Sequence, residues 1–323
     1  MNKNIKNILK ITLPLLLGVF LVWYSLSQIS ISELIKYFKK ADYTYIVLGM
    51  FFGLLSHLSR AYRWQFQLEP MGYKIKLGNS IMAVFATYLI NYTIPRAGEV
   101  ARASILTNYE GVPFEKGFGT IVAERIADLI VMLGIIAVTL FLQFDFIYGF
   151  LVEKFNPTKI AISFAILLVL GLLFLRFINT SSSKIAIKIK GFVSGLVEGV
   201  LSIFKMKKKW AFIFHTLFIW TMYVLMFYVT TFSLQEMSNI PFAAVLIGFI
   251  AASFSIAATN GGIGSYPEAI VLVFTSLFFI PEDPSRAFGW IIWSAQTVLI
   301  IICGGLSLIY LPIFNRNKDS SKA

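Results

Sequence analysis

Several groups that carry common protein chemistry are scarce in this sequence of 323 residues. There is one cysteine, Cys303, and there are two histidines, His57 and His215. An intramolecular disulfide framework is therefore excluded, and a thiolate metal site has too few ligands. The two histidines lie far apart among apolar residues, which favours packed or hydrogen-bonded side chains over metal ligands. We expect no metal and no cofactor.

Charged residues are also few. They make up 14% of the chain, against roughly 25% in soluble domains, while 58% of the residues are hydrophobic. The mean hydropathy is +0.78, and several apolar runs reach the roughly twenty residues that cross a bilayer as a helix. The net charge of +12 is better explained by membrane topology than by nucleic acid, which we do not expect as a partner.

These patterns predict an all-α polytopic membrane protein in which residues 1–323 form one transmembrane domain. Two interrupted segments, at about 75–113 and 240–280, are predicted to be broken re-entrant helical hairpins, although continuous spans also fit the hydropathy. Residues 29–42 read as a polar connection and 143–157 as a loop. Residues 181–209 form either an amphipathic basic cytoplasmic segment or an internal connector. About six full transmembrane helices are expected, at about 11–26, 43–66, 118–142, 158–177, 210–232 and 288–314.

The distribution of lysine and arginine tests this topology. If each hairpin returns to the side of the membrane from which it enters, most lysines and arginines fall on the side that also holds both termini. Because basic residues are enriched on the cytoplasmic side, this indicates that both termini are cytoplasmic. Lys36, Lys39 and Lys40 do not fit the pattern. The order of elements then repeats with opposite orientation, in half-repeats at about 1–150 and 151–314. Such an inverted repeat is typical of transporters, whose sites lie where the broken helices meet.

The stretch from Asn91 to Asp128 concentrates charge inside this apolar chain. Its charged residues include Arg96, Arg102, Arg125, Glu99, Glu110, Glu124 and Asp128. Charge at membrane depth is costly and marks functional sites. Glu124 and Asp128 are four residues apart, so a helix presents them on one face. The cluster is either an ion-pair network that holds the fold or a site for a substrate or proton. Arg60 and Arg63 are read as snorkelling to the interface, although Arg60 is deep enough to face this site instead.

Both interrupted segments contain helix breakers. Pro95 interrupts the first, and Gly261, Gly262 and Gly264 interrupt the second. A broken helix exposes a helix N-terminus, whose free N–H groups and dipole favour anions. Arginines beside it can hold a phosphate through two parallel hydrogen bonds. Guanidinium groups, carboxylates and such backbone in a membrane suit a lipid headgroup.

Three ordered motifs resemble the lysylphosphatidylglycerol synthase transmembrane family. They are Asn91 with Arg96, Glu99 and Arg102, then Glu124 with Arg125 and Asp128, then Gly261, Gly262 and Gly264 with Glu268. The resemblance implies a flippase-like protein of the bacterial inner membrane that moves a modified phospholipid, and some relatives belong to polyprenyl-phosphate sugar pathways. The late motif departs from the family pattern at Asn260 and Pro267, which leaves the role of Glu268 open. The aminoacyltransferase domain of the full-length synthetases is absent from this sequence, so we do not expect lipid synthesis from tRNA.

We therefore expect binding and translocation of an anionic phospholipid or polyprenyl-phosphate-linked substrate. Arg96, Arg102 and Arg125 would bind the phosphate, while Glu99, Glu124 and Asp128 would orient them or carry a proton. Gly261, Gly262 and Gly264 would let the second hairpin approach the headgroup. A membrane transferase with Glu99 or Asp128 as base is the alternative, and a structural partner without transport activity is the third. No nucleotide-binding GxxxxGK[ST] pattern occurs in the sequence. The lipid and the oligomeric state are not predicted.

Overall fold

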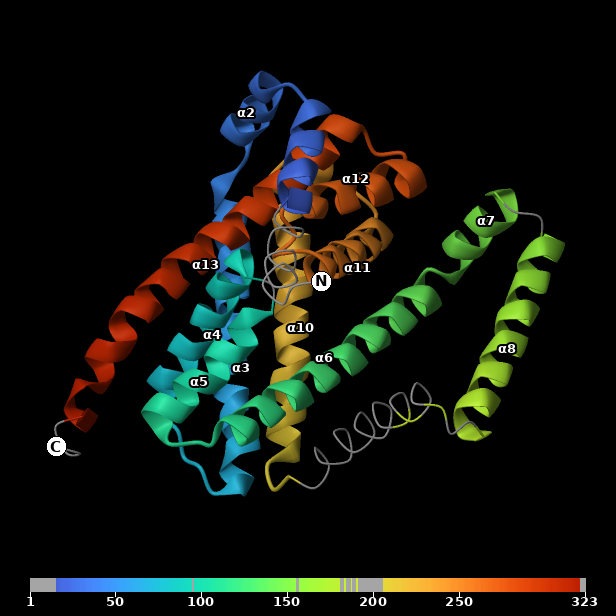
Figure 1. Ribbon diagram of the computed structural model, residues 1–323. Coiled ribbons are helices and arrows are strands. Elements are labelled where there is room, and N and C mark those ends of the chain that lie inside the picture. Colours follow the sequence, from blue (N-terminus) through green and yellow to red (C-terminus); the bar gives the residue numbers. More distant parts are fainter. Residues whose placement is uncertain are drawn as a thin grey trace. The chain divides into compact units, whose positions relative to one another are not determined.

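The computed structural model describes residues 16–94, 96–154, 157–180 and 206–319, together with Ser183, Ile187 and Lys190. Every regular element in these residues is a helix, as the sequence predicts (Figure 1). The chain forms two compact units, Met1–Val122 with Trp210–Ala323 and Ala123–Lys209, and we describe each by itself. Pro95 and most of the amphipathic segment predicted at 181–209 lie outside the described residues.

The first unit contains most of the helices. In chain order they are an unlabelled helix Leu16–Ser27, α2 Ile31–Lys40, α3 Tyr43–Leu68, the short helix η1 Glu69–Met71, α4 Leu77–Thr93, α5 Ala97–Glu110, the start of α6 Phe114–Leu142, α10 Lys209–Thr231, the short helix η2 Gln235–Met237, α11 Phe242–Ala258, α12 Ser265–Phe278 and α13 Glu282–Asp319. The second unit contains the remainder of α6, then α7 Phe144–Lys154 and α8 Pro157–Thr180, and α7 packs against α8.

Two expected connections are helices instead. The stretch 29–42 forms α2, which begins where the Ser30 hydroxyl accepts a hydrogen bond from the backbone N–H of Glu33 at 3.2 Å. Serine at this position caps a helix because it satisfies one of the free N–H groups of the first turn. Most of the loop expected at 143–157 is the helix α7. Both helices are too short to contain the long apolar run that marks a span.

Three described helices are long and apolar enough to cross a membrane: α6, α10 and α13. A fourth span arises if Leu16–Ser27 and Ile31–Lys40, which meet at a bend of 83°, are counted as one. The expected number of six therefore stays a prediction. Helix α3 is long as well, but its second half carries buried polar side chains, including Arg60, Arg63 and Gln67.

Two stretches of the chain have the same order of elements. A long helix, a short 3-10 helix, a hairpin of two helices and another long helix follow one another in α3–η1–α4–α5–α6 and in α10–η2–α11–α12–α13. The first hairpin helices, α4 and α11, both have 17 residues, and the second ones, α5 and α12, both have 14. Each second helix begins after a residue with positive φ, Arg96 at 59° and Gly264 at 69°. Each also ends at one, Gly111 at 71° and Phe279 at 52°.

The long helix α13 contacts both hairpins through its two halves (Figure 1). At its C-terminal end, the side-chain amides of Asn315 and Asn79 on α4 exchange hydrogen bonds of 2.7 and 2.9 Å. At its N-terminal end, Arg286 forms an ion pair with Glu268 on α12. Each hairpin therefore packs on a different half of α13.

The first hairpin is also held by a buried apolar cluster. Helices α3, α4, α5 and the start of α6 contribute to it, with Trp64, Ala83, Leu106 and Ile121 all at most 1% exposed. Close packing of this kind positions the charged residues of α5 described below.

Candidate functional site

The tip of the first hairpin is closed by Asn91. Its side-chain oxygen accepts a hydrogen bond from the backbone N–H of Gly98 at 2.8 Å, and its NH₂ group donates to Glu99 at 3.3 Å. Gly98 also lies so close to the carbonyl oxygen of Thr87 that a Cβ atom would collide with it. The structure thus brings Asn91 and Glu99 together, and their contacts join the end of α4 to the first turn of α5.

Arg96 lies exposed at this tip, immediately before α5. Its backbone is left-handed, with φ 59° and ψ 9°, a conformation that costs a non-glycine residue roughly 1–2 kcal/mol. The N-terminus of α5 carries partial positive charge from its dipole. The exposed guanidinium and the helix end together make the tip favourable for an anion.

Arg102 lies in a different environment. It is 1% exposed, and its guanidinium carbon stands 3.8 Å from the centre of the Trp64 ring on α3. The Trp64 indole N–H donates to the Thr120 hydroxyl at 2.8 Å. Arginine stacked on tryptophan is stabilised by the ring's negative face. Arg102 is therefore an interior residue of the helical packing, whereas Arg96 is at the surface of the tip.

The third motif arginine and its two acids lie on α6, in the second unit. Glu124 and Asp128 are buried, at 0% and 6% exposure, and Arg125 is exposed. Glu124 and Asp128 lie four residues apart on this helix, so they share one face, as the spacing predicts. Their place in a site with the hairpins stays a prediction from the sequence.

The tip of the second hairpin depends on glycine. Gly261, Gly262 and Gly264 all have positive φ, between 63° and 78°. A Cβ atom on Gly261 would stand 2.7 Å from the ring of Tyr92 at the end of α4. One on Gly264 would collide with the backbone of the helix Leu16–Ser27. The glycines therefore permit both the turn and the close approach of neighbouring elements.

The two hairpin tips meet against the middle of α13. Tyr92 hydrogen-bonds Thr297 through its hydroxyl at 3.2 Å, and Trp293 donates its indole N–H to the backbone oxygen of Gly261 at 2.9 Å. In this way both tips are tied to residues about one turn apart on the same helix. We call the following group the hairpin junction: Tyr92, Gly261, Tyr266, Trp293, Gln296 and Thr297.

The side chains of the hairpin junction are aromatic, amide or hydroxyl groups, and none is charged. Gln296 donates to the Tyr266 hydroxyl at 3.4 Å. Apart from Gly261, none of these residues was singled out from the sequence. The sequence feature that could have identified them is the presence of amide and hydroxyl side chains, Gln296 and Thr297, inside the apolar run of α13.

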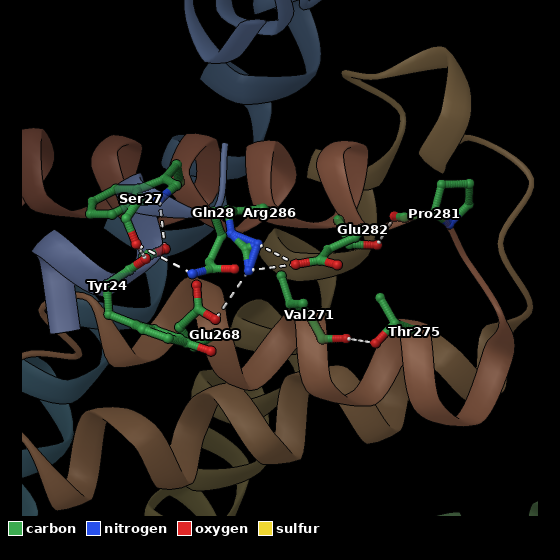
Figure 2. A network of polar contacts seen from close by, with 12 residues as sticks. Tyr24, Ser27, Gln28, Glu268, Val271, Thr275, Pro281, Glu282 and Arg286 are labelled. Carbon is green, nitrogen blue, oxygen red and sulfur yellow. Dashed lines mark hydrogen bonds and ion pairs between the residues drawn. The ribbon is translucent and has the colours of Figure 1, made fainter. Parts of the chain in front are cut away.

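Glu268 is held by a buried arginine (Figure 2). Arg286, 2% exposed, donates to Glu268 at 3.3 Å and to Glu282 at 2.9 Å, and the Glu282 side chain is 55% exposed. Figure 2 shows the Gln28 side chain beside this group. The pair fixes the first turn of α12 on α13, close to the hairpin junction. The sequence alone does not predict Arg286 as its partner.

Polar residues of α3 bond α10. Arg63 is fully buried and donates to the Thr216 hydroxyl at 2.7 Å, so it does not snorkel to an interface. Arg60 is also buried, at 3% exposure. Ser59 and His215 are hydrogen-bonded at 2.8 Å, which confirms the interhelical role expected for this histidine. Among the described residues, no group of three or more His, Cys, Asp or Glu side chains is arranged to hold a metal ion.

Fold and sequence together define a helical integral membrane protein with two broken-helix hairpins. The chain belongs to the family described as the lysylphosphatidylglycerol synthase TM region, whose sequence model matches residues 11–305. It is 24% identical to the UPF0104 membrane protein MJ1595 of Methanocaldococcus jannaschii over 98% of both chains. It is 29% identical to the glycosyltransferase AglD of Haloferax volcanii, over 39% of this chain and 20% of that protein. No solved structure matches the chain.

Proposed function

We propose that this protein is a flippase-like carrier that moves a phospholipid or lipid-linked phosphate headgroup across the membrane between its two hairpin tips. The observation that supports this most directly is the hairpin junction, where two broken helices meet against one long helix. Irregular backbone at membrane depth is tolerated only where protein or a water-filled path covers it. Transporters place their substrate sites at such breaks.

The matching order of elements supports an inverted repeat as the basis of this movement. In this proposal α3 to α6 and α10 to α13 are the core of the two half-repeats, about 1–150 and 151–314. The hairpins enter from opposite leaflets, and six full spans complete the domain. Equal hairpin lengths and left-handed residues at equivalent ends are what two related halves would retain. Movement of one half against the other would open the junction to each side in turn.

The roles of the site residues follow from their environments. Arg96, exposed on the N-terminus of α5, would receive the phosphate through charge-assisted hydrogen bonds. Asn91 and Glu99 would hold that tip in shape, and Arg102 would support α5 from inside. Glu124, Arg125 and Asp128 would orient the substrate or carry a coupling proton.

The second hairpin would complete the passage. Gly261, Gly262 and Gly264 carry no side chain that would obstruct a headgroup, and Glu268 would stay fixed by Arg286 while the tip moves. We propose that the substrate is an anionic phospholipid or a polyprenyl-phosphate-linked molecule in the cytoplasmic membrane of a bacterium, with both termini of the protein in the cytoplasm.

Reconstitution in liposomes tests this function. Purified protein should move fluorescent anionic phospholipid or labelled polyprenyl phosphate between leaflets, alone or with a pH gradient. Arg96→Gln should slow the movement roughly tenfold, the equivalent of about 1.4 kcal/mol. Arg316→Gln removes another exposed arginine, at the end of α13, and should leave the rate unchanged. Movement of neither lipid by the unaltered protein would refute the proposal.

A membrane transferase is the second candidate, because one relative is a glycosyltransferase. In that case Glu99 or Asp128 would act as general base toward a lipid phosphate. Transfer of a labelled sugar to lipid by the purified protein, abolished by Asp128→Asn, would favour the enzyme. Transport without any product would favour the carrier.

A further inference from the structure

Helix α2 lies at one end of the first unit and is set across the helix that precedes it (Figure 1). The angle between Leu16–Ser27 and Ile31–Lys40 is 83°. None of the ten residues of α2 is buried. A helix with so little cover needs another surface for its apolar side chains.

The apolar residues of α2 form one stripe. Ile31, Leu34, Ile35 and Phe38 recur at the spacing of three and four residues that places side chains on one helix face. Ile31 is 65% exposed and Ile35 48% exposed. This face therefore leaves large side chains uncovered by the protein.

The basic residues of α2 form a second stripe beside the first. Lys36, Lys39 and Lys40 are spaced three and four residues apart, and all three are exposed. Lys36 pairs with Glu33 at 3.3 Å. An exposed ion pair of this kind contributes little free energy and leaves the lysine able to meet other anions.

Exposed aromatic side chains stand before and after α2. Trp23 and Tyr24, near the end of Leu16–Ser27, are 64% and 42% exposed, and Tyr43 and Tyr45, at the start of α3, are 57% and 37% exposed. Tryptophan and tyrosine gather at the boundary between lipid and water because their rings are apolar and their polar atoms need water. Both neighbours of α2 thus indicate that it lies at the level of this boundary.

The remaining contacts hold α2 against the first unit. The backbone N–H of Asp42 donates to the Ser233 oxygen at 2.8 Å. Partial burial of Tyr37, and then the charges of Glu236 and Asp283, raise the pKa of its hydroxyl from the usual value of 10.0. Helix α2 also contacts α13, so it is supported on one side.

We propose that α2 lies in the plane of the membrane interface, with Ile31 and Ile35 among the acyl chains and Lys36, Lys39 and Lys40 on the phosphates of anionic lipids. Amphipathic helices with a basic polar face bind such surfaces through both interactions. This goes beyond the proposed transport function. It also explains why Lys36, Lys39 and Lys40 do not follow the excess of basic residues on the cytoplasmic side. These lysines bind lipid headgroups next to α2, so they need not determine the orientation of the chain.

Spin labels at single cysteines test the position of α2. Cys303 is the only cysteine, so Cys303→Ser gives a background free of thiols. Labels placed at each position from 31 to 40 are read in liposomes for collisions with oxygen, which concentrates in acyl chains, and with a water-soluble nickel complex. The two signals should alternate with the helix period, with oxygen favoured at 31 and 35 and nickel favoured at 36 and 40.

Three other outcomes would overturn the proposal. Nickel access at every position would place α2 in water. Oxygen access at every position would make α2 part of a membrane span with Leu16–Ser27. Protection of positions 31 and 35 from both reagents would mean that another protein or a second copy covers the apolar face.

A second arm tests the anionic partner. In liposomes containing phosphatidylglycerol, replacing Lys36, Lys39 and Lys40 by glutamine should lower oxygen access at position 35, and replacing them by arginine should preserve it. In purely zwitterionic liposomes the two triple variants should give the same reading. Equal readings for both variants in phosphatidylglycerol would overturn the role of the lysines.

Discussion

At the scale of single residues, close approach and buried charge explain most of what holds the first hairpin. Gly98 lets α4 and α5 touch, Asn91 bonds across their tip, and Arg102 stacks on Trp64. The sequence identified Asn91 and Arg102 because polar residues are rare in apolar runs. It could not identify Trp64, since a tryptophan in a span is common and its partner is 38 positions away on another helix.

Gly98→Ala should destabilise the protein by about 1–3 kcal/mol, because a new methyl group would push α5 away from the Thr87 carbonyl. The melting temperature of the purified protein measures this. Gly119→Ala is the matched control, since a Cβ there meets nothing within 4 Å. Helix propensity alone should make that change neutral or slightly stabilising. Equal melting temperatures for both variants would contradict the close contact.

Trp64→Phe should cost about 1–3 kcal/mol of stability, because it removes the indole N–H that bonds Thr120 and weakens the surface on which Arg102 stacks. Trp23→Phe changes an exposed tryptophan in the same way and should have little effect. Thermal unfolding of the two variants in the same detergent gives the comparison. A larger loss of stability for Trp23→Phe than for Trp64→Phe would contradict the role of Trp64 in the packing.

At the scale of elements, helix α13 organises the first unit. It binds α4 along one half and α12 along the other, and the tips of both hairpins reach its middle. Glu268 and Arg286 fasten α12 to it. The second hairpin is therefore anchored by an ion pair near its tip, and the first by the Asn79–Asn315 pair at the far end of α4.

The three members of the arginine network should contribute unequally. Arg286→Gln should cost about 3–5 kcal/mol, because it leaves Glu268 without the cation that compensates it. Glu282→Gln should cost less than about 1 kcal/mol, because that side chain is 55% exposed and exposed pairs are weak. Glu268→Gln should fall between them. If Glu282→Gln lowered the melting temperature more than the other two variants, the network described here would be contradicted.

The sequence predicted the long helices and both hairpins because unbroken and broken apolar runs directly reflect what can be buried in lipid. It missed α2 and α7, whose short stretches mix polar and apolar residues. It also missed the tertiary partners. Arg286 and Glu268 lie on different helices, and Trp293 bonds the backbone oxygen of Gly261. Neither contact joins residues close in the sequence, so no local sequence pattern predicts it.

At the scale of the whole chain, the proposed function requires that the two tips separate. Tyr92 and Gly261 are the point where they touch. If a headgroup passes between the hairpins, joining these two positions must stop it. If the contact only holds the fold together, joining them should do no harm.

Cross-linking this contact is the most direct measurement of the central claim. Tyr92→Cys and Gly261→Cys are combined in the Cys303→Ser background, reconstituted, and assayed for lipid movement before oxidation, after oxidation and after reduction. Each single-cysteine variant is the control for the substitutions themselves. If the headgroup passes between the tips, the oxidised pair should lose lipid movement and reduction should restore it, while the single variants should not respond to oxidation. Full movement of lipid through the cross-linked protein would contradict passage between the hairpin tips.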